Sequence, residues 1–303
     1  MASERSKTLK RVISVCEKKD INAWRIASDR ITRYIKSDSY QLICPESQVE
    51  DFKSASSSGW SVVGEELYSS GCEPVYIRGR VSGHNTSRVN WLFQQFIKIN
   101  AIVGSELADD DAVLIWDADT IPLREIDFFD SGRLSCFHGP EHHRPYFETI
   151  EKLFGFGRMA DQSFIAQCLP VRVGWVREMV GEIETRFAKP YVDAVLNLLP
   201  GNSGSEFSEY ETIGSWVLVH YPDGMTFKKK KRWLRSGARI FGPAPSELRI
   251  GLGSWILSIC YDFVALENWS RPLNWARLRG FFARRVFGRV LARNGGAPSE
   301  GPE

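Results

Sequence analysis

The 303-residue sequence predicts an α/β fold, in which a mixed, mostly parallel sheet carries helices on both faces. Short β-branched runs alternate with helix-like stretches through the first half of the chain, and this alternation is typical of βαβ units. The apolar run Ala112–Trp116 has the composition of a strand that is buried on both faces of a parallel sheet. The first half therefore indicates a domain of the nucleotide-binding type.

The elements of the first half follow one another in this alternation. They are a strand at Arg11–Cys16, a helix at Ile21–Ile35, a strand at Tyr40–Cys44, a helical stretch at Gln48–Lys53 and a strand at Ser61–Val63. An amphipathic helix follows at Ser87–Ile102, because its apolar residues recur every three or four positions. Beyond the buried run we expect helices at Pro145–Leu153, Val171–Phe187 and Tyr191–Leu199, a strand at Ser163–Cys168, and an apolar helix between Phe207 and His220.

The composition excludes several classes of protein. Apolar residues make up 43% and charged residues 25% of the chain, so a collagen-like, disulfide-scaffold or wholly disordered protein is excluded. The six cysteines include no Cys-x-x-Cys pair, which favours free thiols in a reducing compartment. The first residues contain no apolar run of the kind that a secretory signal needs. We therefore expect a cytoplasmic protein.

Positive charge is concentrated late in the chain. Residues 1–224 hold 24 basic and 32 acidic residues, whereas residues 225–293 hold 15 basic and 3 acidic ones. Such a block contacts the phosphates of a nucleotide, a nucleic acid or an anionic lipid surface, or it is a solvated basic face. Residues 273–293 predict an Arg-rich amphipathic helix that either contacts the inner face of the cell membrane or docks on the domain. The apolar stretch Ile250–Leu266 contains Asp262 and two glycines, so we expect it to be buried or interfacial.

One face of the helix at Ser87–Ile102 carries polar side chains together with a tryptophan. Trp91, Gln95 and Lys98 share this face by the spacing of three and four residues. The polar face of an amphipathic helix usually faces solvent. A tryptophan among the polar residues favours a wall that faces a ligand.

Two carboxylates follow the buried run. Asp117 and Asp119 lie just past its end, and alternation in an extended segment points both side chains the same way. Ligands of open α/β sheets bind outside the carboxyl ends of the strands. Two hard oxygen ligands placed there suit Mg²⁺ or Mn²⁺ shared with a diphosphate. The alternative is a capped turn, in which both carboxylates bind backbone amides.

Several segments taken in order resemble the GT-A class of nucleotide-sugar glycosyltransferases, and within it a bacterial family with a Trp-Asp-Ala-Asp motif. The segments are the first strand with the following Glu17-Lys-Lys-Asp20, the helix Trp91-x-x-Gln-Gln-x-x-Lys98, the strand end Trp116-Asp-Ala-Asp119, and Phe207-Ser-Glu-Tyr-Glu211. They span residues 10–240, and their order carries the resemblance. No single segment is diagnostic.

The resemblance implies roles for individual residues. Asp20 is expected near the nucleoside, Asp117 near the ribose and the metal ion, and Asp119 on the metal ion. Trp91, Gln95 and Lys98 are expected to contact the donor.

A later acidic residue of such enzymes often accepts the acceptor's proton, and Glu209 and Glu211 are candidates for this role. Residues two apart on a helix do not face the same way, so at most one of them points into the site. We favour Glu209.

The resemblance extends to the late basic segment and to the partners. His220, followed by a basic run that includes Lys231, is similar to the segment with which some members complete the metal site and bind the diphosphate, although the gap is longer here. An isolated histidine after an apolar helix is otherwise a core or capping residue. The acceptor is expected to be a saccharide or lipid-linked precursor of a surface polysaccharide or glycolipid. The expected organisation is a catalytic domain at 1–240, a helical basic extension at 241–293 and a disordered tail at 294–303.

Other readings remain open at this point. A phosphatase of the haloacid-dehalogenase type also uses Asp-x-Asp after a buried strand, with an aspartyl nucleophile. Such enzymes carry the motif near the start of the chain, whereas 116 residues precede Asp117. A non-catalytic lipid or nucleic-acid binding module is the third reading, but no nucleic-acid binding signature is visible and we expect no nucleic-acid partner. The loop with His138, His142 and His143 lacks a fourth zinc ligand at the usual spacing, so we expect it near the acceptor cleft.

Overall fold

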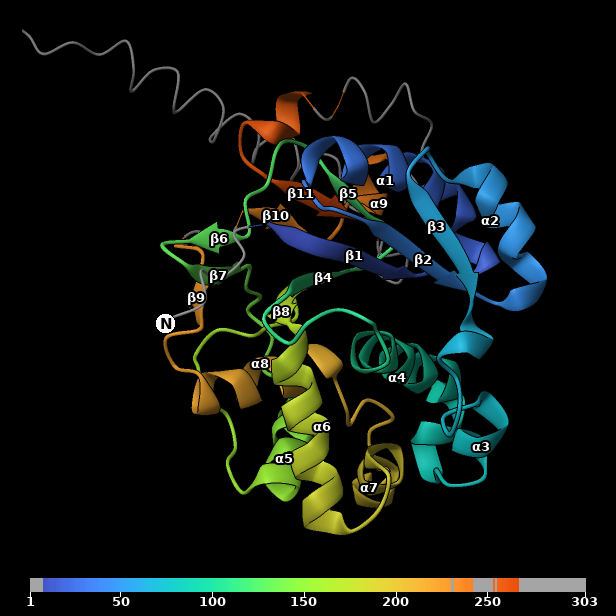
Figure 1. The fold of residues 1–303 in the computed structure, drawn as a ribbon, viewed down its shortest axis with the longest axis vertical. Coiled ribbons are helices and arrows are strands. Elements are labelled where there is room, and N and C mark those ends of the chain that lie inside the picture. The colour runs from blue at the N-terminus through green and yellow to red at the C-terminus, as the bar shows by residue number, and fades with distance from the viewer. Residues whose placement is uncertain (1–7, 230–231, 242–252, 254, 267–303) are drawn as a thin grey trace, which may run out of the picture.

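The computed structural model describes residues 8–229, 232–241, 253 and 255–266. Its centre is a five-stranded sheet with the strand order β3-β2-β1-β4-β8 (Figure 1). The first four strands run parallel, and β8 is antiparallel to β4. This arrangement confirms the predicted mixed, mostly parallel α/β class. The strands are β1 (Leu9–Val15), β2 (Tyr40–Cys44), β3 (Trp60–Gly64), β4 (Ala112–Trp116) and β8 (Cys168–Arg172).

The strand order changes direction at β1. The chain passes from β1 outward to β2 and β3 on one side, and it returns to β4 on the other side. Such a reversal leaves a crevice outside the carboxyl ends of the neighbouring strands, and ligands of open α/β sheets bind there. Because β1 ends at Val15 and β4 at Trp116, the residues just after these two positions are the first candidates for a site.

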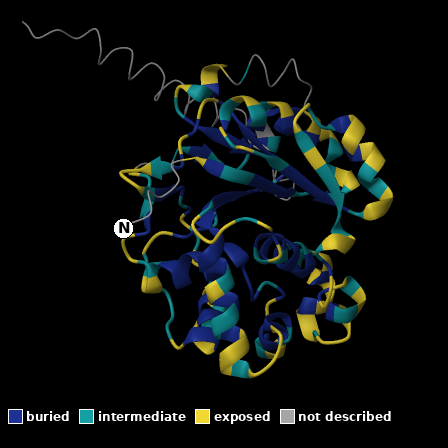
Figure 2. Ribbon diagram, viewed as in Figure 1, coloured by how far each residue is buried: buried dark blue, intermediate teal, exposed yellow. Residues whose placement is uncertain are grey.

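Helices cover both faces of the sheet (Figure 1). α1 and α2 lie over one face, and α4, α6 and α8 lie over the other, with α3, α5 and α7 further out. Buried residues gather where these helices meet the sheet (Figure 2). The helices are α1 (Ile21–Tyr34), α2 (Val49–Ala55), α3 (Pro74–Arg78), α4 (Val89–Val103), α5 (Arg144–Phe154), α6 (Val173–Phe187), α7 (Tyr191–Leu198), α8 (Glu209–His220) and the short α9 (Ala238–Phe241). Short 3-10 helices lie at Lys18–Asp20, Glu46–Gln48, Glu65–Leu67 and Gly83–Arg88.

Two small sheets adjoin the central one. β5 pairs antiparallel with β11, which pairs parallel with β10, and β7 lies between β6 and β9. The backbone N–H of Leu266, next to β11, donates to the backbone oxygen of Asp119 (2.9 Å). Part of the segment expected to be a helical extension is therefore a strand close to the paired carboxylates. These strands are β5 (Thr120–Pro122), β6 (Phe129–Asp130), β7 (Arg133–Cys136), β9 (Met225–Phe227), β10 (Trp233–Leu234) and β11 (Phe263–Ala265).

The end of β4 is held by a buried tryptophan. The Trp116 side chain is fully buried, and its indole N–H donates to the backbone oxygen of Thr120 (2.8 Å). Its ring packs edge-on against Phe128 and Phe263, at centroid distances of 6.4 and 5.1 Å. These contacts fix the turn between β4 and β5, which is the turn that carries Asp117 and Asp119.

The strand β8 differs from the prediction. A strand was expected at Ser163–Cys168, but β8 begins at Cys168, and α6 begins at Val173 rather than Val171. Pro170 lies inside β8, opposite Leu114 of β4. Because β8 is at the edge of the sheet, it tolerates a residue without a backbone N–H, and this proline hides the strand in the sequence.

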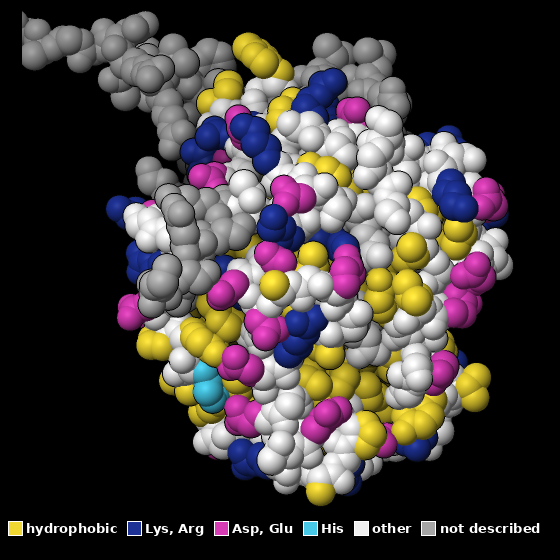
Figure 3. Space-filling view, viewed as in Figure 1, with side chains coloured by type: hydrophobic (Ala, Val, Ile, Leu, Met, Phe, Trp, Pro, Cys, Tyr) yellow, Lys and Arg dark blue, Asp and Glu magenta, His cyan; other side chains and the backbone are white. Residues whose placement is uncertain are grey.

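The late part of the chain is described only in part. No helix among the described residues has the length and apolar character needed to cross a membrane. The predicted basic helix at 273–293 and the tail at 294–303 lie outside the described residues, so membrane contact stays a prediction. On the face of the molecule in Figure 3, basic and acidic side chains are interspersed rather than separated by sign.

Candidate active site

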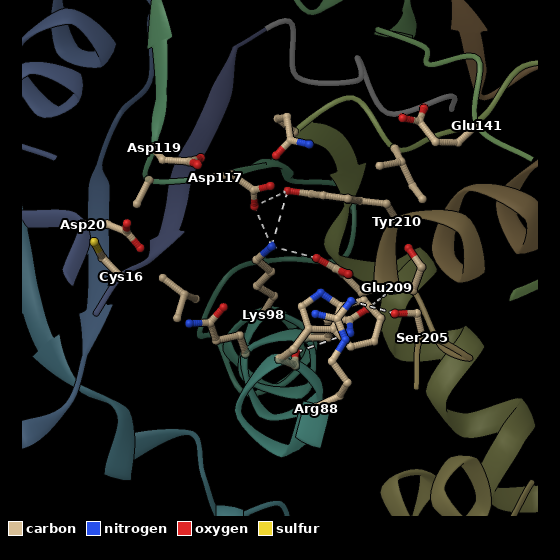
Figure 4. A pocket seen from close by; sticks show the side chains of 18 of the residues that line it. Cys16, Asp20, Arg88, Lys98, Asp117, Asp119, Glu141, Ser205, Glu209 and Tyr210 are labelled. Carbon is tan, nitrogen blue, oxygen red and sulfur yellow. Dashed lines mark hydrogen bonds and ion pairs between the residues drawn. The ribbon is translucent and has the colours of Figure 1, made fainter. Parts of the chain in front are cut away.

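A cavity of about 710 Å³ opens at the carboxyl ends of β1 and β4, where the strand order reverses. Its lining comes from the residues just after β1, the start of α4, the turn after β4, the loop before α5 and the start of α8. Figure 4 shows the labelled side chains converging on this space from both sides. The cavity is therefore assembled from segments that are far apart in the sequence.

Both carboxylates of the Asp-x-Asp motif line this cavity. The backbone N–H of Asp117 donates to the oxygen of Gln167 (3.0 Å), and the N–H of Thr120 donates to the oxygen of Asp117 (3.0 Å). The turn is thus held by backbone bonds and by the Trp116 indole. The Asp117 carboxylate instead contacts side chains, which argues against the capped-turn alternative for this residue.

The buried side chain of Lys98 contacts two acidic residues that line the cavity with it. Nζ of Lys98 donates to Oδ1 of Asp117 (2.6 Å) and to Oε1 of Glu209 (2.7 Å). The hydroxyl of Tyr210 donates to the same Oδ1 of Asp117 (2.8 Å). Gln95 supports this arrangement from α4, because its Oε1 accepts from the backbone N–H of Glu209 (3.0 Å). Dashed lines in Figure 4 mark the contacts of Lys98.

Burial and charge set the protonation of this cluster. Burial alone would lower the pKa of Lys98, but the nearby Asp117 and Glu209 carboxylates outweigh it, so the pKa is raised and the ammonium form is favoured. Burial raises the pKa of Glu209 above its usual value, although Lys98 opposes the shift. Burial, followed by the charges of Asp117 and Glu209, raises the pKa of Tyr210, which keeps its hydroxyl a donor.

The side of the cavity next to β1 is acidic. Glu17, Asp20 and Asp119 line it together with the thiol of Cys16. Burial raises the pKa of Asp20. Burial and then the charges of Asp20 and Asp119 raise the pKa of the Cys16 thiol well above its usual value. The raised pKa favours the neutral thiol of Cys16 in this wall of the cavity.

Most of the residues singled out in the sequence meet in this cavity, together with His143 of the histidine loop, whereas Glu211, His220, His138 and His142 do not line it. Glu211 is buried on another side of α8, where it accepts from the hydroxyl of Ser163, and it does not line the cavity. Glu209 begins α8 and His220 ends it. The His220 ring stacks on the Trp216 ring, with ring centroids 4.1 Å apart. The residues that do line the cavity are Asp20, Trp91, Gln95, Lys98, Asp117, Asp119 and Glu209.

The expectation that His220 completes a metal site is therefore corrected. Its Nε2 lies 3.3 Å from Oε2 of Glu182, and its Nδ1 lies 3.0 Å from the backbone oxygen of Trp216. The helix α8 separates it from the paired aspartates, because twelve residues of α-helix extend about 18 Å. Lys231, which was expected to bind the diphosphate, lies outside the described residues.

Several residues that line the cavity are not predicted from the sequence. Arg88 precedes Trp91 by three positions, so the helical spacing used for Trp91 could have found it. Tyr210 lies between the two glutamates that were weighed as proton acceptors, and no periodicity marks it. Tyr146 and Ser205 come from a helix start and a loop that only the tertiary structure brings to the cavity.

The paired aspartates fit one kind of metal site and not another. Within the described part of the chain, no group of three or more His, Cys, Asp or Glu side chains is arranged to hold a metal ion. Mg²⁺ commonly uses one or two carboxylates together with water and substrate phosphates. The side-chain hydrogen bonds that Lys98 and Tyr210 donate to Asp117 both use Oδ1. Oδ2 of Asp117 and the Asp119 carboxylate thus suit an ion that binds together with a diphosphate, but not one held by the protein alone.

Comparison with known proteins finds distant structural similarity and no match to the sequence. No family model matches the sequence, and no curated protein sequence matches it. Mouse xyloside xylosyltransferase 1 in its apo form has a TM-score of 0.48 and 10% identity, over 88% of this chain and 99% of that one. The galactosyltransferase LgtC, in complex with donor and acceptor sugar analogs, has a TM-score of 0.39 and 11% identity, over 95% and 98%. The apo bifunctional glycosyltransferase WbbM has a TM-score of 0.42 and 10% identity, over 90% of this chain and 47% of that one. Likeness at this level leaves the function to be argued from the cavity itself.

Proposed function

We propose that this protein is a glycosyltransferase that moves a sugar from a nucleoside diphosphate sugar to a hydroxyl group of a saccharide or lipid-linked acceptor. The observation that carries this proposal is the position of Asp117 and Asp119. Both line a cavity at the strand-order reversal, and the fixed ammonium of Lys98 lies directly beside Asp117. This combination suits a ligand with a diphosphate, because the switch-point crevice is where α/β sheets bind nucleotides.

The acidic side of the cavity is the proposed nucleotide side. It lies at the end of β1, beside the point where the strand order reverses. Asp20 there supplies a carboxylate that can accept hydrogen bonds from ribose hydroxyls. Gln94 donates to Oε1 of Glu17 (3.0 Å), which ties α4 to the segment after β1 and fixes the width of the cavity on this side.

Asp117 and Asp119 are the proposed ligands of Mn²⁺ or Mg²⁺. A bound divalent ion supplies positive charge that stabilises a departing nucleoside diphosphate. The Lys98 ammonium contributes a second, permanent positive charge beside Asp117. It is already held by two carboxylates, so it needs no reorganisation as negative charge develops nearby.

Glu209 is the proposed acceptor of the proton from the attacking hydroxyl. Its carboxylate is buried, lines the cavity and has a raised pKa. A carboxylate whose pKa is raised toward neutrality is a better base than an exposed one. Glu211 is not retained for this role, because its carboxylate is bound to Ser163 outside the cavity.

The test is incubation with a panel of UDP, GDP, CDP and TDP sugars in the presence of Mn²⁺, followed by measurement of free nucleoside diphosphate. We expect release with at least one donor. Asp119→Ala should reduce it by at least about a hundredfold, because a charge-stabilising contact at the leaving group is removed. The matched control is Asp29→Ala, which removes an exposed carboxylate on α1 and should leave release unchanged.

Two outcomes would overturn the proposal. Release of nucleoside diphosphate by Asp119→Ala at the rate of the parent protein would remove the metal assignment. Release of inorganic phosphate from phosphate monoesters, with no turnover of any nucleotide sugar, would instead favour the phosphatase reading.

A further inference from the structure

The side of the cavity away from β1 differs in character from the nucleotide side. Figure 4 shows Cys16, Asp20 and Asp119 on one side of Lys98, and Arg88 and Ser205 on the other. The far side is formed by Arg88, Trp91, His143, Tyr146 and Ser205, which we call the aromatic wall. Lys98 with Asp117, Glu209 and Tyr210 forms the Lys98 cluster. This cluster lies between an acidic half of the cavity and an aromatic one.

The rings of the aromatic wall form a connected surface. Trp91 and Tyr146 have ring centroids 6.4 Å apart and planes inclined by 23°. His143 meets Tyr146 edge-on, with centroids 4.6 Å apart. The guanidinium carbon of Arg88 lies 5.1 Å from the centroid of Trp91. An aromatic surface of this kind, with polar groups at its edge, fits the apolar face of a sugar ring while the hydroxyls reach polar partners.

The wall is held in place by the loop before α8. His143 Nε2 lies 2.6 Å from the backbone oxygen of Ser205, and Arg88 donates to the hydroxyl of Ser205 (2.7 Å) and to the backbone oxygen of Gly204 (3.1 Å). The loop itself is fixed by Glu206. Its carboxylate is 1% exposed, and it accepts three backbone N–H bonds within the loop and one from the side chain of Asn85. The wall is thus preorganised before a ligand arrives.

Arg88 gives the wall a positive charge without a direct acidic partner, and Glu141 and Glu209 line the same cavity. Among the described residues, no carboxylate forms an ion pair with Arg88. Its contacts with Ser205 and Gly204 are uncharged, and the residue is exposed at the cavity edge. A guanidinium held in this way is suited to a carboxylate or phosphate group on the ligand.

We propose that the aromatic wall is the acceptor subsite, and that it takes a saccharide whose ring stacks on Trp91 and Tyr146 and whose carboxylate or phosphate substituent binds Arg88. This inference rests on the proposed function. In the transfer step an acceptor hydroxyl oxygen bonds to the anomeric carbon of the donor sugar, and the bond from that carbon to the diphosphate oxygen breaks. The hydroxyl proton passes to Glu209, and the bonding pair leaves with the diphosphate.

The position of Glu209 favours a sugar acceptor over the nucleobase at this wall. Glu209 and Tyr146 line the same cavity, and burial, followed by the charge of Glu209, raises the pKa of Tyr146 to about 12. Arg88 and Ser205 of the wall lie across Lys98 from Cys16 and Asp20, whereas the nucleotide is expected at the β1 end. A nucleobase stacked on Tyr146 would put the nucleotide on the same side as the proposed base.

The experiment compares two probes that differ only at C6, methyl β-glucuronide with a carboxylate there and methyl β-glucoside with a hydroxymethyl group. Their affinities for the whole protein are measured by saturation-transfer difference NMR titration. We expect the glucuronide to bind at least about tenfold more tightly, and Arg88→Gln to remove this difference. Tyr146→Ala and Trp91→Ala should weaken both probes by about tenfold. The matched controls are Arg144→Gln, an exposed arginine on α5, and Trp255→Ala, an exposed tryptophan outside the cavity.

Donor hydrolysis without acceptor separates this inference from the proposed function. We expect Arg144→Gln and Trp255→Ala to hydrolyse the nucleotide sugar found in the panel at the parent rate, whereas the variants of Arg88 and Tyr146 should keep the parent affinity for that donor. Trp91 is the residue whose side is in question, because the sequence resemblance implies a donor contact and the wall implies an acceptor contact. A glucoside that binds as tightly as the glucuronide would overturn the inference. So would a Trp91→Ala variant that loses donor binding and hydrolysis together, because the wall would then hold the nucleotide. If the parent releases nucleoside diphosphate from no donor, the proposed function fails whatever the probes show.

Discussion

Lys98→Met offers the sharpest test of how the buried charges under the cavity are balanced. The Lys98 ammonium is 2.6 Å from Asp117 and 2.7 Å from Glu209, and the residues Lys98 and Glu209 are only 8% and 3% exposed. Methionine keeps the length and apolar stem of the side chain but removes the charge. Two carboxylates then share a buried site without a cation. Breaking a buried ion pair in this way costs about 3 to 5 kcal/mol of unfolding free energy.

The loss of unfolding free energy in Lys98→Met should grow as the pH rises. One pKa unit corresponds to about 1.4 kcal/mol, so the expected cost equals a further rise of about 2 to 4 units in the pKa of a remaining carboxylate. Burial already raises the pKa of Glu209 in the parent protein. A carboxylate with a raised pKa takes up its proton more readily in the folded state, so the folded state is destabilised as the pH rises. The loss should be full above about pH 8 and should shrink as the pH falls towards 5.

The assay is urea unfolding of the parent and Lys98→Met between pH 5 and pH 9. The matched control is Lys53→Met, which removes the exposed Lys53–Glu50 pair on α2 and should change little at any pH. A Lys98→Met variant as stable as the parent at pH 8 would refute the reasoning. A loss of the same size at pH 5 and pH 9 would also refute it, because the protonation of Glu209 would then play no part.

Three further predictions follow from the cavity and its supporting loop. Glu206→Gln should cost about 1.5 to 3 kcal/mol at neutral pH, measured by urea unfolding. Burial opposes ionisation of Glu206, but its hydrogen bonds outweigh burial and lower its pKa. The contribution should therefore be full at neutral pH and should shrink as the pH falls below the unfolded-state pKa of about 4.3, so a cost that stays the same between pH 7 and pH 3 would contradict this. Gly83→Ala should lower the free energy of unfolding by about 1 to 3 kcal/mol, because Gly83 has φ +57° and an added Cβ would lie 2.3 Å from the oxygen of Gly201. The control Gly157→Ala has open space around the added Cβ and should leave the urea unfolding unchanged. Mn²⁺ alone should bind at least about tenfold more weakly than Mn²⁺ with a nucleoside diphosphate, measured by electron paramagnetic resonance, and equal affinities would contradict a site completed by phosphate.

The central sheet could be predicted from the sequence because its strands are strongly apolar. The predicted ranges Tyr40–Cys44 and Ala112–Trp116 coincide with β2 and β4. The amphipathic pattern of the helix at Ser87–Ile102 likewise found α4 to within two residues. The edge strand β8 was misplaced because Pro170 interrupts its pattern, and only pairing with β4 reveals it.

Local spacing could predict the candidate site only where the residues share one element, whereas Asp20 and Glu209 were expected from the family resemblance. Trp91, Gln95 and Lys98 lie on one face of α4, so their meeting follows from helical spacing. The structure does not bring His220 to the cavity of the paired aspartates, because His220 ends α8 whereas Glu209 begins it, and no local pattern encodes the direction of α8. The contact of Glu209 with Lys98 joins residues 111 positions apart, and packing of α8 on α4 creates it.

The most direct test of the central claim is a crystal structure of the protein with Mn²⁺ and the nucleotide sugar that it turns over. The account predicts that the metal ion contacts Asp119 and Asp117, with the diphosphate on the same side of Lys98 as Asp20. A nucleotide bound against Tyr146, or a metal ion away from both aspartates, would contradict it.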